Sequence, residues 1–334
     1  MSSGKKSVDG AAHERVGSSS NGTPREGLAR EHVTDIQRAR ILSAMVEVVC
    51  EREAASVSVA HVVERAGVSR RTFYEVFDDR EDCFLAAFDE ALLRVAGCVL
   101  PVYEAPLKWR ERIRASLIEF LSFLDGDPGA GRLLVVETLG AGHRALARRK
   151  NVLAQVIEAI DEGRAEAKTG SDPSPLTGEG IVGAVLAVIS GRIVAGDPAP
   201  LVELTNPLMS MIVLPYLGAA AARRELDRPV PKASQHVVRA THDPLRDVQM
   251  RLTYRTVRVL IGLHEHPGAS NRQVGDVAGI PDQGQVSKLL TRLTRLGLIR
   301  NTVGGAPGRG APNAWMLTAK GQEVQESLRA GVGE

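Results

Sequence analysis

Apolar residues recur at helical spacing along most of this chain. Ile41, Ala44, Met45, Val48 and Val49 fall at i, i+3, i+4, i+7 and i+8. They form one apolar stripe, which predicts a helix that begins near residue 34. Before this helix the sequence is rich in Ser, Gly and charged residues and has almost no large apolar side chain. We therefore expect residues 1–33 to be a disordered tail, because they bury too little surface to offset chain entropy.

Two short helices joined by a tight turn are predicted next. Ser58 and Ser69 are good N-caps, and Gly67 between them can adopt the positive φ that often ends a helix. Phe73 and Phe77 of the second helix face inward. The opposite face carries two cations, a hydroxyl and a phenol, which suit guanine edges and phosphate oxygens. This pattern predicts a reader of double-stranded DNA that acts through Arg70, Arg71, Thr72 and Tyr74.

The middle of the chain, residues 81–225, is predicted to be entirely helical. Its last two helices, within 181–192 and 201–222, are apolar on nearly all sides. Such helices lie either in a large core or in an oligomer interface. Small residues on the first of them would let another helix approach closely: Gly183, Ala184, Ala187 and Gly191.

A second reading unit follows a linker at residues 226–246, which is marked by prolines among polar residues. In residues 247–334 we expect three helices, then two strands joined by a Gly/Pro-rich tip, and a final helix. Asn271 and Asp282 are the expected caps of the second and third helices. The exposed face of the third helix, with a cation at the tip, gives a second set of candidate DNA-binding residues: Gln283, Gln285, Ser287, Lys288, Thr291, Arg292 and Arg309.

Composition limits the other classes of function. The formal net charge of the 334 residues is only +2, so a nucleic-acid surface has to be local. The three cysteines are scattered, which fits reduced thiols in a cytoplasmic protein. We expect no transmembrane helix and no contact with a membrane. Nucleophile, phosphate-loop and metal-ligand motifs are missing, so we expect no enzyme, no cofactor and no metal.

The turn and second helix of the first reader resemble the DNA-binding domain of the TetR family of bacterial regulators. The family pattern is met by Ala66-Gly-Val-Ser69, Thr72, Tyr74, Phe77 and Glu81. Arg80 replaces the usual Lys and Cys83 the usual Leu. The resemblance implies a helix-turn-helix domain at 34–80, in which Ser58 and Arg80 join the DNA-contacting residues. It also implies a helical domain at 81–225 that binds an unknown small-molecule effector and forms a homodimer, hence a quasi-palindromic operator.

Residues 247–334 resemble a MarR-type winged helix. The matching residues are Val286-Ser287, Leu293, Gly297-Leu298 and Leu317-Thr-x-x-Gly321. The expected fold is therefore mainly α: a TetR-like helix-turn-helix, an all-helical ligand-binding and dimerisation core, and a small α/β winged-helix domain. Winged helices also serve as protein-interaction modules, so DNA reading and partner docking both remain open for this unit.

A ligand-responsive transcriptional regulator, by default a repressor, is the function that these patterns favour. The alternative is a regulator whose winged-helix domain is a protein-interaction or autoregulatory module. Three residues of the helical domain are candidates for lining its effector pocket: Trp109, Glu137 and His143.

Overall fold

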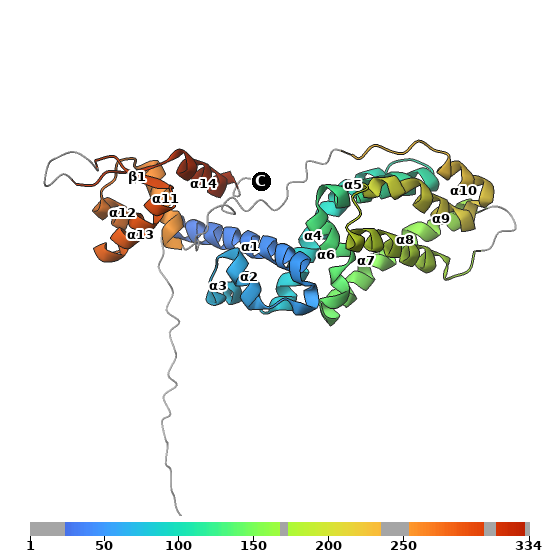
Figure 1. Ribbon diagram of the computed structural model, residues 1–334, viewed down its shortest axis with the longest axis horizontal. Helices are drawn as coiled ribbons and strands as arrows, with labels where there is room; N and C mark the ends of the chain where they lie inside the picture. Colours follow the sequence, from blue (N-terminus) through green and yellow to red (C-terminus); the bar gives the residue numbers. More distant parts are fainter. Residues whose placement is uncertain (1–23, 168–172, 235–253, 304–311, 331–334) are drawn as a thin grey trace, which may run out of the picture.

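The computed structural model describes residues 24–167, 173–234, 254–303 and 312–330. These residues form fourteen α-helices, four short 3-10 helices and one two-stranded antiparallel sheet. The fold is therefore mainly α, with a small α/β part at the C-terminal end, as expected. Figure 1 shows the C-terminal unit at one end of the long helix α1 and the helical core at the other.

The N-terminal head consists of α1 (Pro24–Arg52), η1 (Ala54–Ser56), α2 (Val59–Ala66) and α3 (Arg70–Val76). Helix α1 begins ten residues earlier than the expected start, so a disordered tail reaching to residue 33 is wrong for 24–33. The physical reason is a distant partner: Val33 and Ile36 are buried in the hydrophobic core of the C-terminal unit. Tertiary packing thus stabilises turns that have little helical preference of their own.

The two short helices form for the predicted reasons. The Ser58 side chain accepts from the backbone N–H of His61, and Ser69 accepts from Thr72 at 3.0 Å. Gly67 between them has φ 64°, a left-handed conformation that ends α2. Phe73 and Phe77 are buried in the core that α1 covers. The angle between α2 and α3 is therefore set by two caps, one glycine and one aromatic anchor.

The helical core continues the hydrophobic core of the head without a break. Helix α7 ends at Asp161 and passes into a 3-10 turn. The helix expected at 201–222 is divided at Gly218, where φ is 75°. The elements are α4 (Arg80–Tyr103), α5 (Trp109–Gly126), α6 (Pro128–Val135), η2 (Glu137–Gly140), α7 (His143–Asp161), η3 (Glu162–Glu166), α8 (Thr177–Ala195), η4 (Leu201–Leu204), α9 (Thr205–Leu217) and α10 (Ala219–Leu226).

Helix α8 is apolar but only partly covered. Among the described helices of 18 residues or more, it alone has the length and composition of a membrane span, with a mean hydropathy of 1.6 over its window and 22% of that window buried. The sequence reading did not anticipate this result. Interface helices have the same composition, so a single helix of this kind is weak evidence for a membrane.

The C-terminal unit has the predicted order of elements: α11 (Tyr254–Glu265), α12 (Asn271–Ala278), α13 (Gln283–Arg295), β1 (Ile299–Asn301), β2 (Trp315–Leu317) and α14 (Ala319–Ala330). The strands pair with Ile299 opposite Leu317. Asp282 caps α13 as expected, but the cap of α12 is Ser270. The expected cap Asn271 instead accepts a hydrogen bond from the Trp315 indole at 2.6 Å, which ties α12 to β2.

Candidate nucleic-acid interface and core cavity

The outer face of α3 presents the predicted chemistry. Arg70 and Arg71 are exposed, and Tyr74 is 57% exposed while its ring edge rests on Phe73 at 5.4 Å. Arg71 forms an ion pair with Glu75, one turn later, at 2.8 Å. Thr72 is half-buried, with its hydroxyl 2.8 Å from that of Ser69. The structure therefore brings two cations and a phenol together on one exposed helix face.

Two residues expected at DNA have other partners. The Ser58 hydroxyl caps α2, as described above. The Arg80 guanidinium donates to the carbonyl oxygens of Ala54 and Ala141, at 2.5 and 3.2 Å. Its cation is used inside the molecule, so the expected phosphate contact of Arg80 does not fit this arrangement. The sequence could not show this, because Ala141 lies 61 residues away.

Arg80 belongs to a set of contacts that joins the head to the core, here called the junction: Ala54, Arg80, Glu81, Glu137 and Ala141. The backbone N–H of Ala54 donates to the buried Glu137 carboxylate at 2.8 Å. Glu81 accepts from the backbone N–H of Arg144 at 2.7 Å, in the first turn of α7. Helix α4 therefore begins where η1, η2 and α7 meet.

The junction also contains a strained residue. Glu53 has φ 63° and is the only described non-glycine residue with positive φ. It directly precedes Ala54, whose N–H is held by Glu137. Side chains rarely adopt this conformation, which costs of the order of 1–3 kcal/mol. The buried carboxylate of Glu137 thus holds a turn that local preference would not keep.

The third helix of the C-terminal unit, α13, also carries a polar face. Val286, Leu290 and Leu293 are buried, as predicted. On the opposite side Gln283, Gln285, Ser287, Lys288, Thr291 and Arg292 are all exposed. Gln285 accepts a hydrogen bond from Arg255 of α11 at 2.8 Å. Arg309 lies outside the described residues.

A cavity of about 500 Å³ lies in the helical core between α4, α5, α7 and α8. Its wall is almost entirely apolar, with residues such as Phe88, Leu92, Phe120 and Val185. Arg149, Ser116, Tyr103 and Glu162 are among its few polar lining residues. A cavity of this size and character is typical of a small-molecule site.

None of the three predicted pocket residues is among those that line this cavity. Trp109 is buried and donates its indole N–H to the Ala159 carbonyl. Glu137 accepts the hydrogen bond from the Ala54 backbone at the junction, and His143 is exposed at the start of α7. The sequence offers only a weak indication that Arg149 lines the cavity, since it shows a cation next to the apolar face of a helix. What distinguishes Arg149 from the other arginines of this helix is the lack of an ion-pair partner among the described residues, which only the structure shows.

The cysteines are poorly suited to redox chemistry. Burial raises the pKa of the Cys50 thiol to about 11, and it raises the pKa values of Cys83 and Cys98 as well. The reactive form of a cysteine is the thiolate. These thiols therefore stay protonated at neutral pH and pack as small apolar groups.

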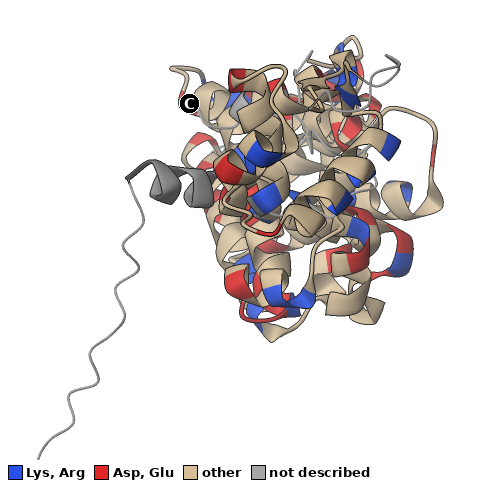
Figure 2. Ribbon diagram, turned by 90° about the vertical axis from the view of Figure 1, so that its left-hand side faces the viewer, with Lys and Arg blue, Asp and Glu red and all other residues tan. Residues whose placement is uncertain are grey.

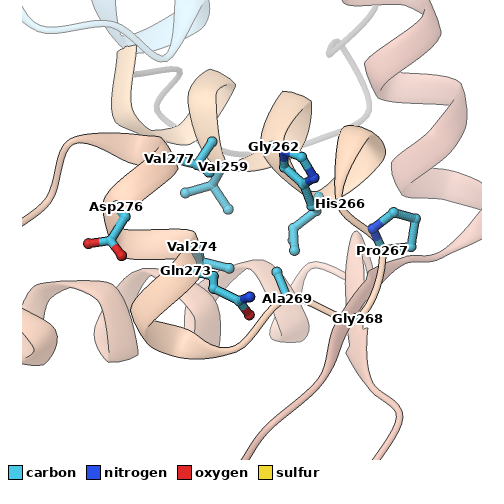
Figure 3. A pocket seen from close by; sticks show the side chains of 11 residues that line it. Val259, Gly262, His266, Pro267, Gly268, Ala269, Gln273, Val274, Asp276 and Val277 are labelled. Atoms are coloured by element: carbon cyan, nitrogen blue, oxygen red, sulfur yellow. The ribbon is translucent and has the colours of Figure 1, made fainter.

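A second, smaller cavity of about 330 Å³ lies in the C-terminal unit between α11 and α12. Figure 3 shows its apolar floor, formed by Val259 and Val274, with Gln273 and Asp276 among the polar residues of its lining. Gln273 completes the capping box of α12 with Ser270. One of the polar groups in the lining is thus already engaged in local structure.

Charge is mixed over the surface. Figure 2 views the molecule from the side of the C-terminal unit, and Lys/Arg and Asp/Glu segments are interspersed there. In the described residues, no group of three or more His, Cys, Asp or Glu side chains is placed to hold a metal ion. Any DNA surface is therefore a local one, of the size of a single helix face.

Comparison with known proteins adds to this picture. Solved structures similar to the chain include the fatty acid degradation regulator FadR from Bacillus halodurans, with 18% identity, a TM-score of 0.47, and coverage of 53% of this chain and 94% of that chain. Another is FadR from Bacillus subtilis in complex with stearoyl-CoA, with 20% identity, a TM-score of 0.46, and coverage of 52% and 96%. A third is a TetR family regulator from Marinobacter aquaeolei VT8, with 22% identity, a TM-score of 0.45, and coverage of 55% and 97%.

The sequence match to a family is confined to the head. It runs from residue 41 in α1 to residue 87 in α4, so it includes both short helices and the turn between them. It also includes the exposed face of α3. Residues 41–87 of this chain therefore match the model of the bacterial regulatory proteins of the tetR family.

Proposed function

We propose that this protein is a ligand-responsive DNA-binding transcriptional regulator, by default a repressor. The observation that carries the proposal is the exposed face of α3, with Arg70, Arg71 and Tyr74, in the segment that matches the tetR family. A helix of this size fits the major groove, where arginine forks meet guanine edges and phosphates.

The effector site of the proposed regulator is the core cavity. Helices α4 and α7 both line it, and both begin at the junction, at Arg80 and His143. A ligand that separates α7 from α4 pulls on the bond between Glu81 and the Arg144 backbone, and so moves α4 and the head. A coupling free energy of about 1–3 kcal/mol is enough to release the operator.

A homodimer is the proposed assembly, because one side of α8 and α9 is apolar and uncovered. On α8 the exposed positions Gly180, Gly183, Ala187 and Gly191 follow one another every third or fourth residue. An added Cβ at any of the three glycines would meet no atom within 4 Å. On α9, Met211 and Leu214 are 38% and 48% exposed. Pairing this face with its own copy would give two-fold symmetry and a quasi-palindromic operator.

Ala187→Glu is expected to convert the dimer into monomers, because it places a charge in the centre of the proposed interface. The molar mass from light scattering coupled to size-exclusion chromatography is the measurement. Ala147→Glu on the exposed side of α7 is the matched control and is expected to leave the mass unchanged. A wild-type protein that is already a monomer, or an Ala187→Glu variant that stays a dimer, would show that this face is not the interface.

The C-terminal unit is proposed to be a winged helix that also reads DNA. The exposed polar face of α13, with Lys288 and Arg292, favours this role. Its docking on α1 through Val33 and Ile36 also favours it, since the same helix packs against α2 and α3. The second candidate is a module that docks a protein partner. The exposed face of α13 serves either role, so the two are separated by experiment.

Replacing Lys288 and Arg292 together by Ala in the full chain is expected to shorten the DNase footprint. It should also lower the slope of log K against log salt by about one per lost phosphate contact. The control replaces Lys320 and Arg224 by Ala, which removes two exposed charges elsewhere. An unchanged footprint and slope, with operator binding retained, would assign the unit to partner docking.

A further inference from the structure

Two polar groups in the apolar wall of the core cavity have no partner. The Ser116 hydroxyl oxygen is buried and forms no hydrogen bond. The Arg149 guanidinium forms no hydrogen bond or ion pair with any described residue, whereas its neighbour Arg148 is paired with Asp89 at 2.7 Å. The cavity-lining Tyr103 and Glu162 are satisfied by each other at 2.8 Å. The two remaining polar lining residues, Gln155 and Glu158, are exposed, so the free groups that are at least half-buried are one cation and one hydroxyl.

The unpaired Ser116 hydroxyl costs stability unless something binds it, because a buried donor or acceptor without a partner has lost its hydrogen bond to water. The Arg149 side chain is half-buried, and its nitrogens still reach solvent. Burial lowers the pKa of Arg149, because desolvation disfavours its charged form. Both groups are therefore available to a ligand in the cavity.

The positions of these groups give the shape of that partner. Asp89 of α4 accepts a hydrogen bond from Arg148 of α7, and fourteen residues later Tyr103 of α4 donates to Glu162, just after α7. Helices α4 and α7 therefore run side by side in the same direction over fourteen residues. That stretch is roughly 21 Å long. The cavity follows it from Phe88 and Arg149 at the junction end to Tyr103 and Glu162 at the far end. The cavity is therefore elongated, with the cation near one end.

Ser116 lies towards the opposite end of the cavity. Arg112, one turn earlier on α5, binds Glu162 at 2.6 Å. Arg112 also stacks on Tyr103 at the end of α4, whereas Asp127, just after α5, binds Arg94 in the middle of α4, so α5 runs in the opposite direction to α4 and therefore to α7. Ser116 is thus about one turn, roughly 6 Å, inward from the Glu162 end. It lies roughly 15 Å along the cavity from Arg149.

We propose that the effector is a single-chain carboxylate: an unbranched apolar chain whose carboxylate binds Arg149 and which carries a hydroxyl or carbonyl oxygen that accepts from Ser116. The inference rests on the proposed function only in that the cavity is taken as the effector site. An apolar chain matches the wall, and the two oxygen-bearing groups match the two free donors. A neutral apolar molecule would leave both donors unsatisfied.

Isothermal titration of the full-length protein with dodecanoate, 12-hydroxydodecanoate and dodecan-1-ol tests the proposal. Both carboxylates are expected to bind at least tenfold more tightly than the alcohol, and the hydroxy acid more tightly than dodecanoate. Arg149→Gln should remove the preference for the carboxylates, whereas Arg149→Lys should keep most of it. Ser116→Ala should weaken binding of the hydroxy acid alone. Arg148→Gln, the neighbouring cation outside the cavity wall, should change none of the three affinities.

Equal affinity for dodecan-1-ol and dodecanoate, or unchanged affinities in Arg149→Gln, would overturn the proposal. Binding of the hydroxy acid that does not depend on Ser116 would overturn its second contact. Titration requires no DNA, so this result is separate from that of the proposed function. A carboxylate that binds through Arg149 but fails to release operator DNA would refute effector control and leave the ligand assignment intact.

Discussion

Arg71→Ala is expected to weaken operator binding by roughly tenfold to a hundredfold, which corresponds to about 1–3 kcal/mol for one well-formed arginine contact. Arg71 is the most exposed of the paired cations, with 89% of its side chain exposed, and it lies on the outer face of α3. Its removal leaves no cavity and breaks only a surface ion pair. The fold should therefore be unaffected, and the loss should appear in a gel shift as a higher dissociation constant.

Replacing Glu75, the ion-pair partner of Arg71, should have the opposite effect on operator binding. Glu75 accepts from the Arg71 side chain at 2.8 Å and adds a negative charge to the same helix face. Glu75→Gln releases the guanidinium and removes that charge, so operator binding should tighten by about two- to fivefold, as expected for an exposed pair worth 0.2–1 kcal/mol. Equal effects of both variants, or no effect of Arg71→Ala, would contradict the assignment of α3 as the reading helix.

Tyr74→Phe separates the phenol from the ring. The ring edge packs on Phe73, so the substitution keeps that contact and removes only the exposed hydroxyl. Loss of one hydrogen bond to phosphate should weaken binding by about tenfold or more, since such bonds to charged groups are worth about 1.5–3 kcal/mol. The effect should be similar for all operator sequences, because phosphate contacts position the protein and do not read bases.

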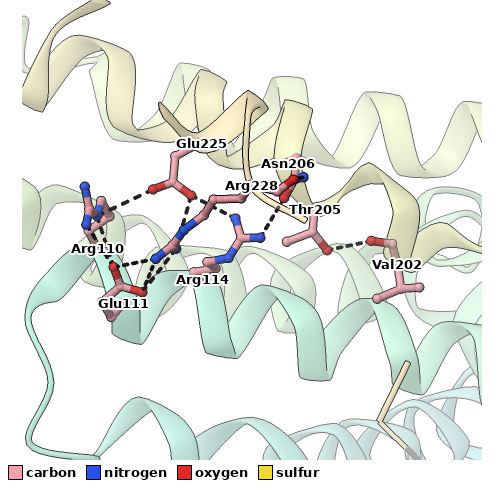
Figure 4. A network of polar contacts seen from close by, with 8 residues as sticks. All are labelled: Arg110, Glu111, Arg114, Val202, Thr205, Asn206, Glu225 and Arg228. Carbon is pink, nitrogen blue, oxygen red and sulfur yellow. Dashed lines mark hydrogen bonds and ion pairs between the residues drawn. The ribbon is translucent and has the colours of Figure 1, made fainter. Parts of the chain in front are cut away.

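Glu225→Ala is expected to lower the free energy of unfolding of the core by about 3–5 kcal/mol, the usual cost of removing one partner of a buried ion pair. Glu225 is 1% exposed and binds Arg114 at 2.8 Å. Figure 4 shows the network around it, which joins α5 to α10 and to Asn206 of α9. Arg114 is only 8% exposed. Without the Glu225 carboxylate it would remain charged, with only its hydrogen bond to the Asn206 side-chain oxygen, at 2.6 Å.

The measurement for Glu225→Ala is the urea midpoint of the helical transition followed by circular dichroism. Glu75→Gln, which breaks an exposed pair, serves as control and should change stability by less than about 0.5 kcal/mol. The double variant Arg114→Met with Glu225→Ala should lose less than Glu225→Ala alone, because it leaves no unpaired charge. A Glu225→Ala midpoint equal to that of the control would show that the network contributes no net stability.

The same network gives a direction for the pH dependence. Burial disfavours the charged form of Glu111, but hydrogen bonds from Arg228 and Arg110 outweigh it and lower the pKa of Glu111. A carboxyl with a lowered pKa in the folded state stabilises the protein above its unfolded pKa. This contribution is lost as the pH falls through the folded pKa. The wild-type urea midpoint should therefore fall with acidification below about pH 4.5, less steeply in Glu111→Gln.

Local patterns in the sequence were enough to predict the short helices. The caps Ser58, Ser69 and Asp282 act within three residues, and the inward residues Phe73 and Val286 follow from helical spacing. These features depend on neighbours in the chain. The exposed faces of α3 and α13 follow from the same spacing. Their role in binding DNA remains a prediction.

The features that sequence reading missed depend on partners far along the chain. Arg80 looks like an exposed cation at a helix start, but its acceptors are carbonyl oxygens 26 and 61 residues away. The sequence around Glu53 does not predict its left-handed conformation, because that conformation depends on the hydrogen bond from the next residue, Ala54, to the distant Glu137 carboxylate. Arg149 becomes noticeable only once it is seen to line the cavity without forming an ion pair with a described residue.

The docking of the C-terminal unit on α1 has a consequence for synthesis of the chain. Val33 and Ile36 leave the ribosome more than 220 residues before their partners, which begin at Val257 of α11. At about 5–20 residues per second, the first turns of α1 wait roughly 10–45 s for these partners. The head can complete its own core long before that. A nascent chain therefore exposes Val33 and Ile36 of α1 until the C-terminal unit has been made, so this part of the helix is open to chaperones and proteases during that interval.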